Sequence, residues 1–203
     1  MFVKDKEMYH FHNNQDYNSY WQVGNIIDNS KDFICDYYKK IIEFQPTVFI
    51  PQENNCFPLD LVIDEFLQVS QPTPVYLELL KFSSKYLKYY EIMKREIDLE
   101  EYRKLHFPEL PSRKSAIWLL DKEQISFWME ELEIRERNGS LFKVSATGEL
   151  FKSCDSFLPE KKMSLLESYQ CSEKYWNPDF SKVNEEQVEY LFQGKIKVIE
   201  KIF

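Results

Sequence analysis

A short aromatic run near the N-terminus, and alternation of apolar and polar residues near the C-terminus, predict β-strands at both ends of the chain. Residues 8–12 form a short aromatic run typical of a strand, and residues 21–27 predict a turn into a second short strand. Near the C-terminus, apolar and polar residues alternate over residues 188–198, with an interruption at Gly194. We therefore expect two strands, or one bent strand, at the C-terminal end.

The middle of the chain has apolar residues at spacings of three and four, which predict helices. Residues 60–69 show this spacing, and Pro72-Thr73-Pro74 then supplies a cap and a first-turn proline. The same spacing continues to about Leu105 and predicts one long amphipathic helix. We expect a helical segment over about residues 56–105.

Mixed character returns after this segment. Residues 115–120 are typical of a buried strand, and Asp121 can cap a following helix with Gln124 at the reciprocal position. Asn138-Gly139 predicts the end of that helix. Residues 141–144 predict another strand, which we expect to turn at residues 147–149. The predicted class is α+β, in one domain over residues 1–203 with the helical segment inserted.

Composition and charge narrow the class of protein. The chain has 203 residues and a formal net charge of −8, which disfavours a basic face for duplex nucleic acid. Its 4 glycines stand apart from one another, so the glycine-rich phosphate loops of nucleotide-binding proteins are excluded. No 18-residue apolar run predicts a membrane span, and the first residues lack the apolar core of a signal peptide. We expect a cytoplasmic protein.

Cysteine and histidine positions give little support for a metal site. The 4 cysteines form no C-x-x-C pair, and none lies at zinc-ligand spacing from a histidine, so we predict free thiols and no metal. His10 and His12 would face the same side of a strand, but a third metal ligand would have to come from a distant segment.

Several of these features occur in the order of a known fold. Tyr9-His10, followed by Trp21-x-x-Gly24-x-x-Ile27, resembles the opening of the ADP-ribosyltransferase-like fold in its diphtheria-toxin-like and rifampin-modifying branches. Later segments resemble a bacterial family of unknown function that is assigned to this fold and associated with phage defence. These segments are Arg95-Glu96-x-x-x-Glu100-Glu101-x-Arg103, Phe107-Pro108-x-x-Pro111-Ser112-Arg113, Ile117-Trp118-Leu119, Trp128, Tyr175-Trp176 and Glu189-Tyr190-Leu191-x-x-Gly194-x-x-x-Val198.

The resemblance implies a split β-sheet core and an enzymatic activity. The expected enzyme is a mono-ADP-ribosyltransferase, a glycosyltransferase that moves ADP-ribose from NAD to a protein or nucleic-acid acceptor. It would act as a toxin or an anti-phage defence effector, with an antitoxin or immunity protein as a further partner. The alternative is a catalytically inactive module of the same fold that acts in binding, as an immunity protein or as an antitoxin.

The resemblance also implies roles for individual residues. His10 would position the NAD ribose, and Glu189 would be the catalytic glutamate that stabilises an oxocarbenium-like transition state. Gln187, two residues before Glu189, would meet the acceptor. Arg113 would bind the NAD pyrophosphate. The remaining NAD contacts would come from Tyr9, Ser112 and Trp118.

Two assignments stay open. The tyrosine that usually stacks on nicotinamide is missing from residues 115–118, so the ring would come from Trp118, Tyr9 or Tyr17. In the rifampin-modifying branch the acidic residue follows a Thr-Gly turn, which points to Asp155 after Thr147-Gly148; we prefer Glu189. Apart from the resemblance, Arg113 can also pair structurally with Glu100 or Glu101.

Overall fold

The computed structural model describes residues 1–13, 20–30, 33–43, 47–50, 54–59, 61–63, 74–159 and 163–203. The chain divides into two compact units. The first contains Met1–Tyr38 and Arg95–Phe203, and the second contains Lys39–Lys94. The second unit therefore begins before the predicted insertion at residues 56–105 and ends within the long helix.

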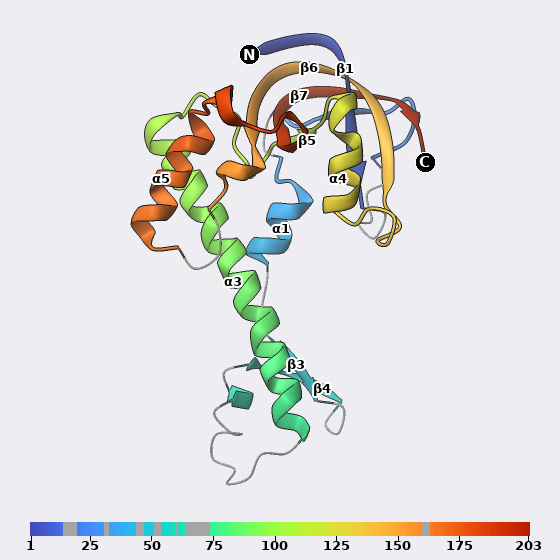
Figure 1. Cartoon of the computed structure of the whole chain (residues 1–203). Coiled ribbons are helices and arrows are strands. Elements are labelled where there is room, and N and C mark those ends of the chain that lie inside the picture. The colour runs from blue at the N-terminus through green and yellow to red at the C-terminus, as the bar shows by residue number, and fades with distance from the viewer. Residues whose placement is uncertain are drawn as a thin grey trace. The chain divides into compact units, whose positions relative to one another are not determined.

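Antiparallel strands form the framework of the first unit, which confirms the α+β class (Figure 1). A 5-stranded sheet has the order β1-β6-β7-β2, with β5 also paired to β7. An isolated bridge between Tyr9 and Leu120 joins β1 to the residue after β5, so the sheet curls back on itself. The strands are β1 (Phe2–His12), β2 (Ile26–Asp28), β5 (Ile117–Leu119), β6 (Ser140–Cys154) and β7 (Val188–Lys201).

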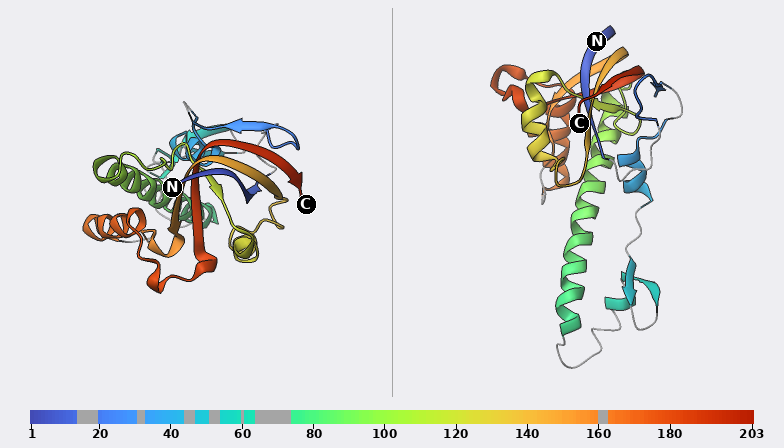
Figure 2. Two further views of the ribbon diagram at one scale, coloured as in Figure 1. Left: turned by 90° about the horizontal axis from the view of Figure 1, so that it is seen from above. Right: turned by 90° about the vertical axis from the view of Figure 1, so that its right-hand side faces the viewer.

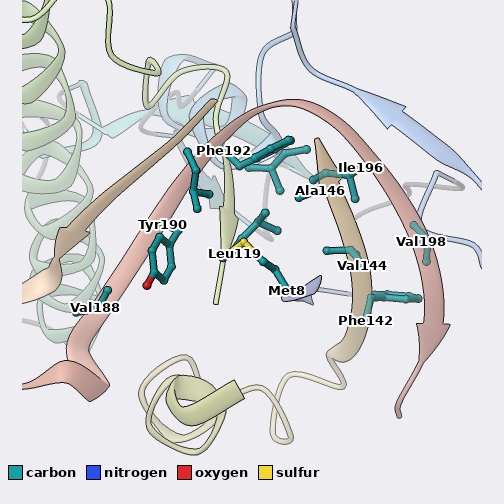
Figure 3. Packing of buried hydrophobic residues seen from close by; sticks show 12 residues of the cluster. Met8, Leu119, Phe142, Val144, Ala146, Val188, Tyr190, Phe192, Ile196 and Val198 are labelled. Atoms are coloured by element: carbon teal, nitrogen blue, oxygen red, sulfur yellow. The ribbon is translucent and has the colours of Figure 1, made fainter. Parts of the chain in front are cut away.

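The curled sheet encloses the main hydrophobic core. Figure 3 shows side chains from β1, β5, β6 and β7 pointing into the space between these strands. Because strand side chains alternate, each strand gives every second residue to this core. The buried members are Met8, Ile117, Leu119, Phe142, Val144, Ala146, Leu150, Val188, Tyr190, Phe192, Ile196 and Val198.

Two glycines allow β6 and β7 to bend together. Gly148 and Gly194 are opposite each other in the pair, and both have positive φ values (156° and 148°). A Cβ on Gly194 would lie 2.5 Å from the carbonyl oxygen of Thr147, which leaves no space for a side chain. The C-terminus is therefore one bent strand, and the turn expected at residues 147–149 is instead the bend of one continuous strand, β6.

Helices cover the outer faces of the sheet in the first unit. The C-terminal part of α3 packs beside α5, where Leu99 contacts Tyr175 and Trp176 (Figure 2). Helix α4 covers Tyr9, Leu120 and Leu141, and Gln124 accepts a hydrogen bond from the Asp121 N–H (2.9 Å), as its capping role predicts. The helices are α1 (Asp36–Ile42), α3 (Pro74–His106), α4 (Ile125–Glu131) and α5 (Leu165–Trp176).

The second unit combines a hairpin with the N-terminal part of α3. Strands β3 (Thr47–Ile50) and β4 (Asn55–Pro58) pair, and Val48 packs with Leu59, Val62 and Leu79. The predicted long helix is confirmed as α3. Of the helix predicted at residues 60–69, the structure describes residues 61–63. Pro72 and Thr73 of the predicted cap lie outside the described residues. No helix among the described residues has the length and apolar character required to cross a membrane.

Candidate functional site

A buried arginine, Arg113, binds two carboxylates and a tyrosine near the start of β7. Its Nε and Nη2 donate to the two carboxylate oxygens of Glu96 (2.7 and 3.1 Å), and its Nη1 donates to Oε1 of Glu189 (3.0 Å). The Tyr175 hydroxyl donates to the same Glu189 oxygen and accepts from Arg113. All four side chains are buried. These residues, Glu96, Arg113, Tyr175 and Glu189, are named the Arg113 cluster.

Attraction between opposite charges offsets burial in this cluster. Burial by itself would lower the pKa of Arg113, but its cluster partners outweigh burial and hold that pKa well above its ordinary value. Burial by itself would raise the pKa of Glu96, but the charge and hydrogen bonds of Arg113 lower it. Burial raises the pKa of Tyr175, so its hydroxyl remains a neutral donor. Each nitrogen of the Arg113 guanidinium is therefore committed to a partner within the protein.

The motif Pro111-Ser112-Arg113 follows α3 in the sequence, and its side chains bind carboxylates of that helix. Glu96 and Glu100 lie four residues apart on the helix, so both face the same side. Arg113 binds the first, while Ser112 donates to Oε1 of the second (2.7 Å). Arg103 also binds Glu100 through two nitrogens. The structural partner of Arg113 is thus Glu96, and Glu100 belongs to Ser112 and Arg103.

Partly exposed rings border the Arg113 cluster. The Trp118 ring lies under the Arg113 guanidinium (5.3 Å to the ring centroid) and meets the edge of Tyr37 (5.7 Å between centroids). Tyr37 is 38% exposed and Trp118 is half-buried. Arg95, one residue before Glu96, keeps 27% of its side chain exposed. Among the described residues, its Nε is a buried nitrogen without a hydrogen-bond partner.

The second candidate carboxylate, Asp155, lies close to the first. Asp155 follows the end of β6, and Ser153 of that strand pairs with Glu189. Burial, and then the negative charge of Glu189, raise the pKa of Asp155. The two residues considered as alternatives therefore belong to one region.

His10 lies on the other face of the sheet from Glu189. The residues on either side of Glu189 enter the main core, and His10 follows the core residue Met8 by two positions. Its Nδ1 donates to the carbonyl oxygen of Trp118 (2.9 Å), and its ring stacks on Trp21 (3.8 Å between centroids). Burial lowers the pKa of His10 to about 3, so the ring is neutral. The structure does not bring His10 and Glu189 together.

The other predicted residues have separate environments. Tyr9 is buried beside Leu120 and Trp128, and Gln187 is half-buried at the end of the 3₁₀ turn Glu185–Gln187. Tyr17 lies outside the described residues. No group of three or more histidine, cysteine or acidic side chains suited to a metal ion occurs in the described part of the chain.

Sequence reasoning missed three contributors to this region. Glu96 belongs to the segment Arg95–Arg103 that carries the resemblance, but no role was predicted for it. Tyr175 was matched only as part of Tyr175-Trp176, and no sequence pattern pointed to Tyr37. A usable signal existed for Glu96, because its spacing of four from Glu100 predicts two carboxylates on one helix face. Tyr37 and Tyr175 reach Arg95 and Arg113 only through tertiary packing.

Comparison with known sequences places the chain in a family. Residues 8–203 match the family described as protein of unknown function (DUF2441), so the chain belongs to this family. The match extends over both structural units. Among curated proteins, none matches the sequence.

Proposed function

We propose that this member of the DUF2441 family is a mono-ADP-ribosyltransferase that transfers ADP-ribose from NAD to a macromolecular acceptor. Glu189 is the catalytic carboxylate in this proposal. Loss of nicotinamide leaves positive charge on the ribose, and a fixed carboxylate stabilises that charge as it develops. The resemblance to proteins associated with phage defence supports a role as a toxin or defence effector.

One arrangement carries the proposal: two carboxylates beside two partly exposed rings. Glu189 is oriented by Arg113 and Tyr175, which fix one of its oxygens. Asp155 lies in the same region, and Trp118 and Tyr37 offer aromatic surface for the nicotinamide ring. A carboxylate stabilises the cation that forms on the ribose, and a ring can hold nicotinamide in place by stacking, so both kinds of group suit cleavage of this N-glycosidic bond.

Arg95 suits the NAD phosphates better than Arg113 does. Arg113 is 3% exposed and donates from every nitrogen to a cluster partner. The Arg95 side chain is 27% exposed, and its hydrogen bonds to Glu96 and Tyr37 both use Nη2. Moving Arg113 to a phosphate would take from buried Glu96 the cation that binds both of its oxygens, which is costly.

The test is NAD turnover by the purified full chain. Radiolabelled NAD is incubated with the protein and a bacterial lysate, and nicotinamide release and labelled products are measured. Glu189→Gln keeps the shape and the hydrogen-bond acceptor but removes the charge, and we expect it to abolish both signals. Glu149→Gln, at an exposed position of β6, is the matched control and should retain both. Absence of both signals with the wild type would reject the enzyme.

One observation favours the inactive alternative. The Oε1 oxygen of Glu189 is already bound by Arg113 and Tyr175, and His10 lies on the other face. An inactive module would release no nicotinamide and show no thermal shift with NAD. A protein that binds NAD gains about 2.7 kcal/mol at a ligand concentration 100 times its Kd. Thermal unfolding with and without NAD therefore separates the two functions.

A further inference from the structure

Asp155 is a half-buried carboxylate that the catalytic role of Glu189 leaves unused. Asp155 lies two residues after Ser153, which is opposite Glu189 in the β6–β7 pair. Strand β6 ends at Cys154, whose backbone is extended, and Asp155 begins the 3₁₀ turn Asp155–Phe157 that follows. The end of β6 therefore brings Asp155 close enough to Glu189 for their charges to interact. No residue in the described part of the chain donates a hydrogen bond to its carboxylate.

Charged groups on several elements affect the pKa of Asp155. Negative charge comes from Glu189 on β7 and Glu131 on α4, and positive charge comes from Arg95 on α3 and Arg113 before β5. Burial and Glu189 have the largest effects, and together they raise the pKa of Asp155. A carboxylate with a raised pKa and free lone pairs is a stronger base than an exposed one.

Glu189 is poorly suited to accept a proton in the same reaction. Its Oε1 accepts hydrogen bonds from both Arg113 and Tyr175, which occupy that oxygen and hold the group in place. A fixed anion stabilises a neighbouring cation, whereas a base must exchange its proton with substrate and solvent. The two carboxylates therefore suit different steps.

We propose that Asp155 is the general base of the transfer reaction, an inference that rests on the proposed function. The bond between ribose C1′ and the nicotinamide nitrogen breaks, and nicotinamide leaves with the electron pair. An acceptor oxygen or nitrogen then bonds to C1′, and its proton passes to the Asp155 carboxylate and on to solvent. Glu189 faces the ribosyl cation, and the products are nicotinamide, the ADP-ribosylated acceptor and one proton.

The test compares transfer with nicotinamide release in the same reaction. The full-length wild type, Asp155→Asn and Asp155→Glu are incubated with radiolabelled NAD and a bacterial lysate, over a range of pH. Removing a general base lowers the transfer rate by about 100-fold or more. We expect Asp155→Asn to reduce labelled product far more than nicotinamide release, and Asp155→Glu to recover part of the transfer. Asp28→Asn, an exposed aspartate on β2, is the matched control.

The pH profile gives a second readout. Transfer by the wild type should rise with pH as Asp155 loses its proton, and Asp155→Asn should lose this rise. An unchanged ratio of transfer to nicotinamide release, with an unchanged profile, would overturn the role of Asp155 while the transferase stands. Absence of nicotinamide release by the wild type would instead overturn the proposed function.

Discussion

Replacing Arg113 with methionine should strongly destabilise the first unit. Arg113 is 3% exposed and neutralises Glu96 and Glu189, which are themselves buried. Methionine fills much of the same volume but leaves both carboxylates without this cation. Removing one partner of a buried ion pair costs about 3–5 kcal/mol, or a Tm decrease of roughly 6–20 °C for a chain of this size.

The loss should depend on pH, and the direction of this dependence follows from the carboxylate of Glu96. In the wild type, Arg113 lowers the pKa of Glu96 in the folded protein. The lowered pKa stabilises the fold at pH values above the unfolded pKa of about 4.3. This stabilisation is lost as pH falls through the folded pKa. Without Arg113, burial outweighs the remaining partners of Glu96 and raises its folded pKa. The variant then gains stability as pH falls through that raised value. The difference between the two proteins should therefore be larger at pH 8 than at pH 5.

Urea unfolding followed by tryptophan fluorescence at both pH values measures this difference. Arg137→Met is the control, because Arg137 pairs with Glu133 at the surface and both are more than half exposed. Exposed pairs contribute little to stability, so this variant should resemble the wild type at both pH values. A loss for Arg113→Met below about 1 kcal/mol, or an equal loss at pH 5 and pH 8, would show that Arg113 does not hold the buried carboxylates as described.

Three further substitutions test other parts of the first unit by thermal unfolding. Asp155→Asn should raise Tm at pH 7 and lose this advantage as pH falls, because the raised pKa of Asp155 makes its ionised form destabilising; an equal Tm at pH 7 would contradict it. Gly194→Ala should lower the free energy of unfolding by about 1–3 kcal/mol through backbone strain, and by more because the added Cβ would meet the Thr147 carbonyl oxygen. Gly24→Ala should lower it less, because the added Cβ meets no neighbouring atom. Asn29→Leu removes the three hydrogen bonds of a buried side chain, which donates to the carbonyl oxygens of Ser115 and Phe192 and accepts from the Gly194 N–H. We expect a loss of about 1–3 kcal/mol for each buried group left unpaired.

Local sequence patterns predicted where strands occur better than they predicted where each strand ends. The aromatic run at residues 8–12 identified the second half of β1, and alternation identified β7. The proline-capped repeat identified α3. The turn expected at residues 147–149 was wrong because Thr-Gly-Glu is typical of turns, whereas Gly148 and Gly194 permit two bent strands to approach closely. That second arrangement depends on two glycines 46 positions apart in the sequence, and no local window contains both.

The candidate site was predictable in its members more than in their roles. The motifs contained Arg113 and Glu189, and the structure joins them at 3.0 Å. The expectation that Arg113 contacts a pyrophosphate depended on its donors being free. Spacing carries no information about that, because Glu96 and Tyr175 occupy those donors only after α3 and α5 have packed.

Strand register explains why His10 and Glu189 cannot share a face. A shift of β1 by one residue would exchange its faces and bring His10 to the side of Glu189. The same shift would remove Met8 from the main core and place Tyr9 there, on the side of Val144 and Phe142. The register that fills the core is therefore the one that separates His10 from Glu189. A catalytic site around Glu189 must therefore use groups on its own face. Asp155, Trp118 and Arg95 are the candidates there, and the substitutions at Asp155 and Glu189 test that site without relying on His10.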